Sequence, residues 1–117
     1  MSDAIPAPQW PATWSRAALG TAVLASLEAG SLHGYGIAQA VQARGFGRPK
    51  GGSLYPLLAS LEAEGAVSTA WEEGNNGPGR RNYTLTDGGR QRLADERQAW
   101  KQLAVALEPE NAGGENR

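Results

Sequence analysis

The sequence predicts a mainly α, α+β fold with three short helices, a two-stranded hairpin and a longer final helix. Apolar residues in its first half recur at the three- and four-residue spacing of helices. The pattern then changes to short segments rich in Val, Thr, Trp and Tyr around a glycine-rich centre, which is typical of a hairpin. With 117 residues, 40% of them hydrophobic and 20% charged, the chain is expected to fold around one core.

The first two helices are predicted from apolar faces that end at a glycine. Over residues 16–29, leucines and a valine recur at helical spacing until Gly30. A turn over residues 31–35 leads into a shorter apolar helix that ends near Gly45. Because Gly and Pro dominate residues 45–52, that stretch is predicted to be a connecting turn.

The third helix has the most regular pattern, with four leucines at positions i, i+3, i+4 and i+7. Ser53 is its expected N-cap, and Pro56 is expected in the first turn, where a missing N–H costs little. Gly65 is expected to end the helix. The four leucines are Leu54, Leu57, Leu58 and Leu61.

A hairpin and a last helix complete the chain. Residues 66–71 and 82–85 are predicted to pair as a two-stranded wing around a glycine-rich tip at residues 74–79. Thr86 then suits the N-cap of a helix over residues 87–108. Three helices, two strands and a final helix, in this order, are the layout of a winged helix-turn-helix with an added dimerisation helix.

This layout divides the chain into four parts. Residues 1–14 are expected to form a flexible N-terminal arm, residues 15–86 the winged helix-turn-helix domain, and residues 109–117 a disordered tail. Residues 87–108 are expected to pair with a second chain, because their apolar face has coiled-coil-like spacing and the small domain cannot cover it. The residues expected at the homodimer interface are Leu93, Trp100, Leu103 and Leu107.

The positive charges are clustered although the formal net charge is −1. Three cations and no acid lie between Arg44 and Pro56. Between Pro78 and Arg92 there are four cations and one acid. A chain with two local basic segments can bind phosphate despite an acidic total, so double-stranded DNA is an expected partner.

The start of the third helix is the expected contact with a duplex. A recognition helix enters a major groove about 12 Å wide with its first turn against bases and phosphates, so its leading residues must be small or polar. The alternative that this stretch is only a loop-to-helix cap stays open. Arg80 and Arg81 of the hairpin are a second expected contact, although such a pair is often only a solvated face. The expected contacts on the helix are Lys50, Gly51, Gly52, Ser53 and Tyr55.

Catalysis and metal binding have little support in the sequence. His33 is the only histidine and there is no cysteine, so neither a nucleophilic triad nor a transition-metal site can be assembled. No enzyme activity, cofactor or metal is therefore expected. No apolar run reaches the ~20 residues of a membrane span, and no secretion signal opens the chain, so a cytoplasmic protein without a membrane partner is expected.

Trp100 allows two interpretations. A large aromatic residue suits the core of a dimer interface, and this interpretation is favoured. Trp100 could also be a stacking wall for a small, flat aromatic effector, and one residue can serve both roles. Trp10 and Trp14 could fold over such a cavity or over the partner subunit.

Several short motifs are specific when they occur together in one order. They are LHGYG at residues 32–36, GSLYPLL at 52–58, LE at 61–62, Gly65, WE at 71–72, RNY at 81–83 and LTDGG at 85–89. With this combination, over about residues 19–108, the sequence resembles the PadR family of bacterial transcriptional regulators, particularly its short members.

The resemblance implies a homodimer whose third helices and wings bind a pseudo-palindromic operator, usually as a repressor that a small molecule releases. Two departures from the family pattern occur. Gly51 and Gly52 replace the Pro-Gly often found before this helix, and the short last helix leaves less room for an effector pocket. The residues that the resemblance implies to face DNA are Tyr35, Lys50, Ser53, Tyr55, Arg80 and Arg81.

The main alternative is a winged helix that binds a protein partner and no DNA. The acidic isoelectric point and the modest basic content keep this alternative open.

Overall fold

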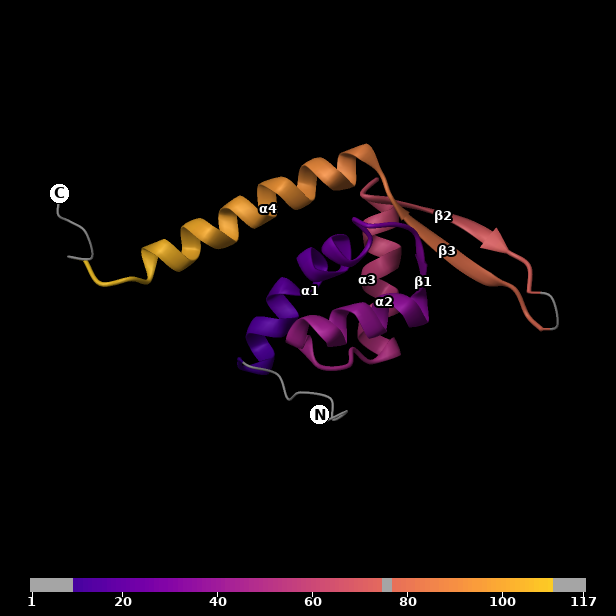
Figure 1. Ribbon diagram of the computed structural model, residues 1–117, viewed down its shortest axis with the longest axis horizontal. Helices are drawn as coiled ribbons and strands as arrows, with labels where there is room; N and C mark the ends of the chain where they lie inside the picture. Colours follow the sequence, from indigo (N-terminus) through magenta and orange to yellow (C-terminus); the bar gives the residue numbers. More distant parts are fainter. Residues whose placement is uncertain (1–9, 75–76, 111–117) are drawn as a thin grey trace.

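The computed structural model describes residues 10–74 and 77–110 and confirms the predicted mainly α, α+β architecture. Figure 1 shows α1, α2 and α3 gathered below the start of α4, with β2 and β3 projecting on one side and the second half of α4 on the other. The elements are α1 (Ala12–Ser26), β1 (Leu32–His33), α2 (Gly34–Val41), a π-helical turn η1 (Gln42–Phe46), α3 (Gly51–Ala63), β2 (Val67–Glu72), β3 (Arg80–Leu85) and α4 (Asp87–Ala106).

One hydrophobic core joins the three small helices, the sheet and the first half of α4. Its members are largely the residues that the helical spacing predicted, and α3 contributes three leucines that are at most 2% exposed. This burial fixes which face of α3 is turned to solvent. The largest fully buried side chains are Val23, Leu24, Leu27, Ile37, Val41, Leu54, Leu58, Leu61 and Leu93.

The sheet has three strands instead of the two that the sequence predicted. Its order is β1-β3-β2, and both pairings are antiparallel. Residues 32–33, predicted to lie in a turn, pair with Tyr83 and Asn82 of β3. A strand of two residues is too short to show an alternating pattern, so only the pairing reveals it.

The first helix begins earlier than predicted. It starts at Ala12 after Pro11 and ends at Ser26, whereas the sequence predicted residues 16–29. Trp10 packs edge-to-face on Phe46 with ring centroids 5.1 Å apart, and its Nε1 donates a hydrogen bond to Ser15 Oγ (2.7 Å). The predicted flexible arm of residues 1–14 therefore includes an ordered part. Residues 1–9 of that arm, and residues 111–117 of the predicted tail, lie outside the described residues.

The third helix also begins earlier than predicted, at Gly51, with Lys50 as its N-cap residue. Ser53 is therefore not the N-cap, and Pro56 lies in the second turn instead of the first. The predicted turn over residues 45–52 contains the first two helical residues, because packing of the leucines outweighs the low helix propensity of glycine. Gly65 ends the helix as predicted, with φ +82° and a hydrogen bond from Ala66 N to the Leu61 carbonyl (2.9 Å).

The N-cap of α4 is Thr86, as predicted. Gly89 N donates to Thr86 Oγ1 (2.9 Å), and Thr86 Oγ1 donates to the Gly65 carbonyl (2.6 Å), which ties α4 to the end of α3. Leu93 was predicted at the dimer interface, but it is 1% exposed within its own chain. This prediction is wrong, because Leu93 packs in the core of its own domain and offers no surface to a partner.

Two neighbouring glycines at the start of α4 test this junction. A methyl group on Gly89 would overlap the Ala66 carbonyl oxygen and lie 2.7 Å from Leu85 Cδ1, whereas the nearest atom to one on Gly88 would be 3.5 Å away. We expect Gly89→Ala to lower the free energy of unfolding by about 2–4 kcal/mol through overpacking. Gly88→Ala is the matched control and should leave it unchanged or raise it by up to ~1 kcal/mol. Urea unfolding followed by circular dichroism measures both, and equal values would contradict the packing described.

Candidate nucleic-acid interface

The solvent face of α3 is lined with small residues. Burial of Leu54, Leu58 and Leu61 turns Gly52, Pro56 and Ala59 outward, and these three are exposed. A helix that carries small side chains on its outer face can approach a groove floor closely. Of this face, only Gly52 was among the sequence predictions, although the leucine spacing already defines the opposite side of the helix.

The first turn of α3 presents polar groups to solvent. Lys50 is exposed, and no side chain caps the helix. The first helical N–H groups, those of Gly51 and Gly52, have no acceptor within a helix that starts there. Together with the helix dipole, these N–H groups favour an anion such as phosphate.

Two tyrosines flank this turn. Tyr35, at the start of α2, is 60% exposed, and Tyr55 is 51% exposed. The ring of Tyr55 lies over Gly34, where an added Cβ would be 2.6 Å from the tyrosine hydroxyl and would displace the ring. The Arg48 guanidinium lies 4.9 Å from the centre of the Tyr35 ring, a cation–π distance. The structure therefore brings predicted residues of two helices to one surface.

Ser53 lies apart from these tyrosines. Ser53 and Tyr55 are two positions apart, which corresponds to about 200° around a helix. Ser53 instead lines a hollow with Leu57, Arg92 and Trp100. The predicted contacts Ser53 and Tyr55 are thus on opposite flanks of α3.

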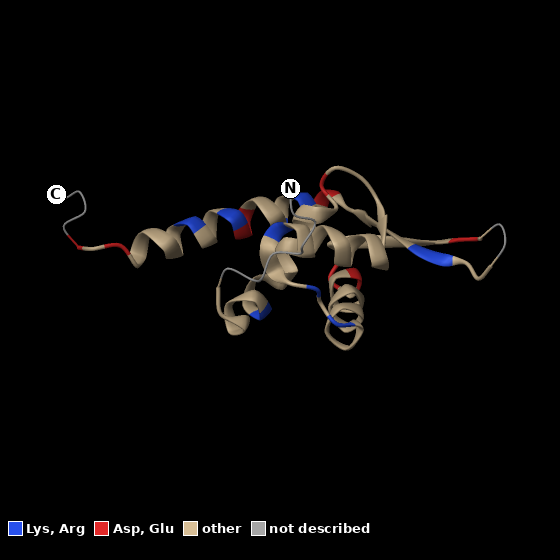
Figure 2. Cartoon of the chain, turned by 60° about the horizontal axis from the view of Figure 1, so that its bottom comes forward, with Lys and Arg blue, Asp and Glu red and all other residues tan. Residues whose placement is uncertain are grey.

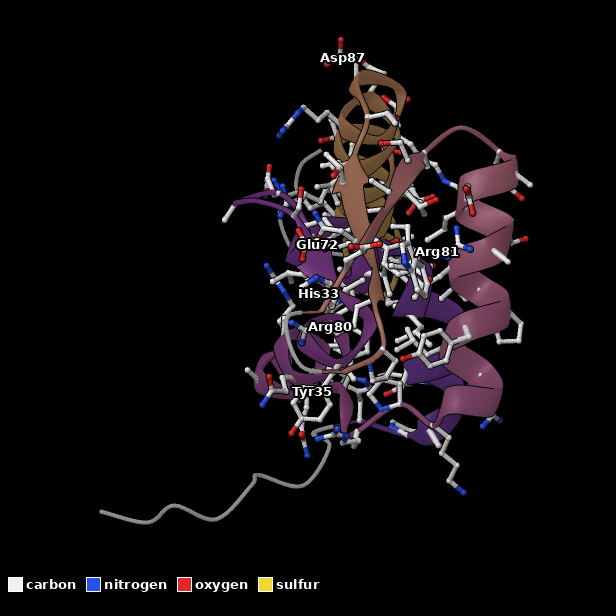
Figure 3. The ribbon with its side chains drawn as sticks, turned by 90° about the vertical axis from the view of Figure 1, so that its right-hand side faces the viewer. His33, Tyr35, Glu72, Arg80, Arg81 and Asp87 are labelled. Atoms are coloured by element: carbon white, nitrogen blue, oxygen red, sulfur yellow. The ribbon has the colours of Figure 1, made fainter. Side chains whose placement is uncertain are left out.

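The two wing arginines point to opposite faces of the sheet, as neighbours on a strand must. Arg81 Nη1 donates to Thr69 Oγ1 (3.0 Å) on the face that packs toward α3. Arg80 pairs in register with Glu72, whose carboxylate is 2.7 Å from His33 Nε2. Figure 3 shows Arg81 on the side of α3 and Arg80 on the side of His33 and Tyr35. The two predicted arginines therefore lie on opposite faces of the wing.

Within the described part of the domain, some cations are held in ion pairs, and others are not. Arg92 pairs with Glu64 and Glu96, and Arg97 pairs with Glu28. Arg44 is exposed and donates to the Ala25 carbonyl of α1 (3.3 Å). Figure 2 shows basic residues on the wing and around the segment before α3. The cations at the interface without an ion-pair partner among the described residues are Arg48, Lys50, Arg80 and Arg81.

A chain of hydrogen bonds holds α4 against α1 near Trp100. Trp100 Nε1 donates to Thr21 Oγ1 (3.1 Å), which donates to Glu96 Oε1 (2.6 Å). Arg92 Nε donates to Glu96 Oε2 (2.8 Å). Burial acts to raise the pKa of Glu96, but the hydrogen bonds from Thr21 and Arg92 hold that pKa below its usual value. The Glu96 carboxylate of α4 is thus hydrogen-bonded to α1 and holds the two helices together.

Trp100 stands between two open hollows. The first lies between α1, α3 and α4 and includes Gly20 and Leu57. The second lies between α1, η1 and α4 and includes Ala22 and Phe46. Neither Trp10 nor Trp14 lines them, because Trp10 packs on Phe46 and Trp14 is 62% exposed on α1. The prediction that these two residues cover a cavity beside Trp100 has no support in the single chain.

The last turns of α4 carry exposed apolar residues. Every residue from 98 to 110 is exposed, and Leu103 and Leu107 are 48% and 76% exposed. Figure 1 shows this half of α4 extending beyond α1. Leu103, Leu107 and Trp100 share one side of the helix, so the unpaired apolar face is continuous.

The comparison with protein families shows to which family the chain belongs. The model of the family described as transcriptional regulator PadR-like matches residues 23–95, which span α2, α3 and the wing. The chain belongs to the PadR-like family of transcriptional regulators.

Individual relatives agree with this membership. The chain is 33% identical over 91 residues to the transcriptional regulator Rv3488 of Mycobacterium tuberculosis, with 78% of this chain and 83% of the relative covered. A PadR family transcriptional regulator from Eggerthella lenta is 26% identical with a TM-score of 0.74, and covers 81% of this chain and 82% of its own. A PadR-like transcription factor from Bacteroides fragilis is 28% identical with a TM-score of 0.70, and the match covers 81% of this chain and 91% of that one.

The family membership confirms three predictions about this PadR-like regulator. The resemblance to PadR proteins is correct, the fold is a winged helix, and the chain is a transcriptional regulator, not an enzyme. Over residues 10–74 and 77–110, no helix is long and apolar enough to cross a membrane and no three metal-ligating side chains cluster.

One exposed aromatic residue of the interface was missed as a site residue. Trp71 is 65% exposed at the outer end of β2 of this PadR-like protein. In the sequence it contributed only to a family motif. Its exposure depends on the register with β3, which periodicity alone does not reveal.

Proposed function

We propose that the protein is a repressor that binds a pseudo-palindromic DNA operator as a homodimer in the cytoplasm and responds to a small aromatic effector. The observation that carries DNA binding is the surface at the start of α3. There, Lys50 is exposed, no side chain of the described residues caps the first N–H groups of α3, and Tyr35 and Tyr55 are exposed. These groups match the requirements of phosphates and base edges at a major groove.

The wing extends this surface. In the proposed complex α3 lies in the major groove with its small residues toward the bases, and Lys50 contacts phosphate. Arg80 and Arg81 follow the backbone or the adjacent minor groove from opposite faces of the wing. Arg48, which lies on the ring of Tyr35, adds a further positive charge near the start of α2.

The salt dependence of binding tests this function. Binding of DNA by cations releases counterions, so each lost phosphate contact reduces the slope of log K against log salt by about 0.9. We expect the double variant K50A/R81A to bind a labelled duplex of its own upstream region more weakly and with a slope reduced by about two contacts. R90A, which removes an exposed cation at the other end of the domain, is the control. Fluorescence anisotropy at several salt concentrations gives the slopes, and equal slopes would remove both residues from the interface.

The proposal of a homodimer is based on the exposed apolar face of α4. Trp100, Leu103 and Leu107 lie on one side of a helix that extends beyond its own domain. A second copy related by a two-fold axis would cover this face with its own. Two-fold symmetry would then place the two α3 helices about one DNA turn apart, ~34 Å.

Polar substitutions on the two sides of α4 test the dimer. We expect L103Q/L107Q to dissociate the dimer, because it removes the exposed leucines of the proposed seam. V105Q is the matched control, since Val105 is 63% exposed on the other side of the helix. Sedimentation velocity should give a monomer for the first variant and a dimer for the second and for the unchanged chain. A monomeric unchanged chain would contradict the proposal.

The effector proposal rests on Trp100. It is 37% exposed and lines both hollows beside α1, so a planar molecule could stack on the indole. The same residue lies next to the proposed dimer seam. An effector there would therefore act where the tilt between the two subunits is set.

Tryptophan fluorescence tests the effector site. We expect planar aromatic compounds from a chemically varied panel to quench the emission of the unchanged chain, because stacking brings them against the Trp100 indole. In W100F the saturable part of the quenching should be lost, whereas W14F should retain it. If no compound quenches in a saturable way, Trp100 has only its packing role.

A further inference from the structure

Aromatic residues of the wing, of α2 and of α3 surround a shallow hollow in the middle of the proposed DNA-binding surface. Its lining includes three tyrosines, Trp71 and both wing arginines, and it is called the wing hollow below. The tyrosines are Tyr35, Tyr55 and Tyr83, and the arginines are Arg80 and Arg81. Its sides come from α2 and α3 on one side and from β2 and β3 on the other. The wing hollow therefore separates the two parts of the protein that are proposed to enter different grooves.

The register of the wing turns Trp71 toward α3. Trp71 pairs with Arg81, and Thr69 pairs with Tyr83, so these residues share one face of the sheet. On this face Val67, Tyr83 and Leu85 pack into the core, while Trp71, farther out, is 65% exposed. Trp71 thus continues the core face of the wing beyond the core itself.

Gly79 allows this position of the indole. A Cβ on Gly79 would lie 2.6 Å from Trp71 Nε1 and Cε2 and 2.7 Å from the Glu72 carbonyl oxygen. No other residue fits there without moving the ring or the strand. The indole therefore lies against the backbone of Gly79, just before β3, and remains 65% exposed.

The groups around the wing hollow are donors that match an anionic, sugar-bearing strand. Neither Trp71 Nε1 nor the Tyr55 hydroxyl has a hydrogen-bond partner among the residues with described positions. Arg80 and Arg81 contribute positive charges. Of the neighbouring carboxylates, that of Glu72 lies 2.7 Å from His33 Nε2, and that of Glu62 on α3 accepts a hydrogen bond from Thr69 Oγ1 (2.8 Å). The aromatic ring faces can pack on deoxyribose, and the N–H and O–H donors can bind phosphate oxygens.

The geometry of a duplex identifies which part of the DNA must pass here. A major and a minor groove are separated by one sugar-phosphate strand. If α3 enters the major groove and the wing reaches the neighbouring minor groove, that strand lies between them. The wing hollow is the space between these two elements.

We propose that the wing hollow binds the sugar-phosphate strand between the two grooves, and that Trp71 is a DNA-binding residue that packs on a deoxyribose and donates its indole N–H to a phosphate. This inference rests on the proposed DNA binding and adds a neutral contact to it. A backbone contact carries no sequence information, so Trp71 contributes equally to specific and unrelated duplexes. Being uncharged, it does not contribute to the salt slope.

Substitutions at Trp71 separate this role from that of the cations. Anisotropy titrations use two labelled duplexes of equal length, one with the chain's own upstream region and one unrelated. We expect W71A to weaken binding to both by about tenfold with an unchanged salt slope, because a stacking surface and one donor are lost. W71F keeps a ring and should lose about threefold. R81A, in contrast, should reduce the salt slope by about 0.9.

One control variant and two folding measurements accompany these titrations. S68A changes an exposed residue of the same strand on the other face and should bind as the unchanged chain does. Circular dichroism and sedimentation establish that W71A and W71F fold and keep the same association state. Unchanged affinity in a folded W71A, a loss on one duplex only, or a changed slope would each overturn the inference. If the unchanged chain binds neither duplex, the proposed function fails instead, and this result is distinguishable from failure at Trp71.

Discussion

Burial of Leu54, Leu58 and Leu61 fixes the rotation of α3 about its own axis, and this rotation decides what its other residues can contact. The small residues Gly52, Pro56 and Ala59 are turned to solvent because the leucines occupy the opposite side. Tyr55 falls on the flank toward the wing, and Ser53 on the flank toward α4. One set of apolar contacts therefore determines both the groove-facing surface and the two sites beside it.

Glycines let aromatic rings lie against backbone on both sides of the wing hollow. Gly34 leaves room for the ring of Tyr55, and Gly79 leaves room for the indole of Trp71. In each pair a Cβ on the glycine would be 2.6 Å from the aromatic side chain. The rings consequently lie against backbone while they remain more than half exposed. Aromatic side chains placed in this way lose little further conformational freedom when a ligand covers them.

The sequence predicted the elements better than it predicted which residues act together. Leucine spacing identified α3, and Gly65 identified the end of that helix, because both signals depend on local geometry. The strand β1 was missed because two residues show no period. Leu93 and Leu107 follow one apolar seam, but only the fold shows that the domain covers the first and leaves the second exposed. The separation of Arg80 from Arg81 was available from strand alternation, whereas the exposure of Trp71 needed the register with β3.

The angle at which α4 leaves the domain is set by a few polar contacts near its middle. Trp100, Thr21 and Glu96 join α4 to α1, and Arg92 continues the chain to Glu64 at the end of α3. Beyond Trp100, residues 101–110 are all exposed within the described part of the chain. An α-helix is stiff over this length, so a small change in these contacts would move the far end of α4 by a larger distance. In the proposed dimer that end belongs to the seam, and the same contacts therefore control the spacing of the two α3 helices. Trp100 is thus placed where one side chain contacts the hollows, the seam and the support of α4 together.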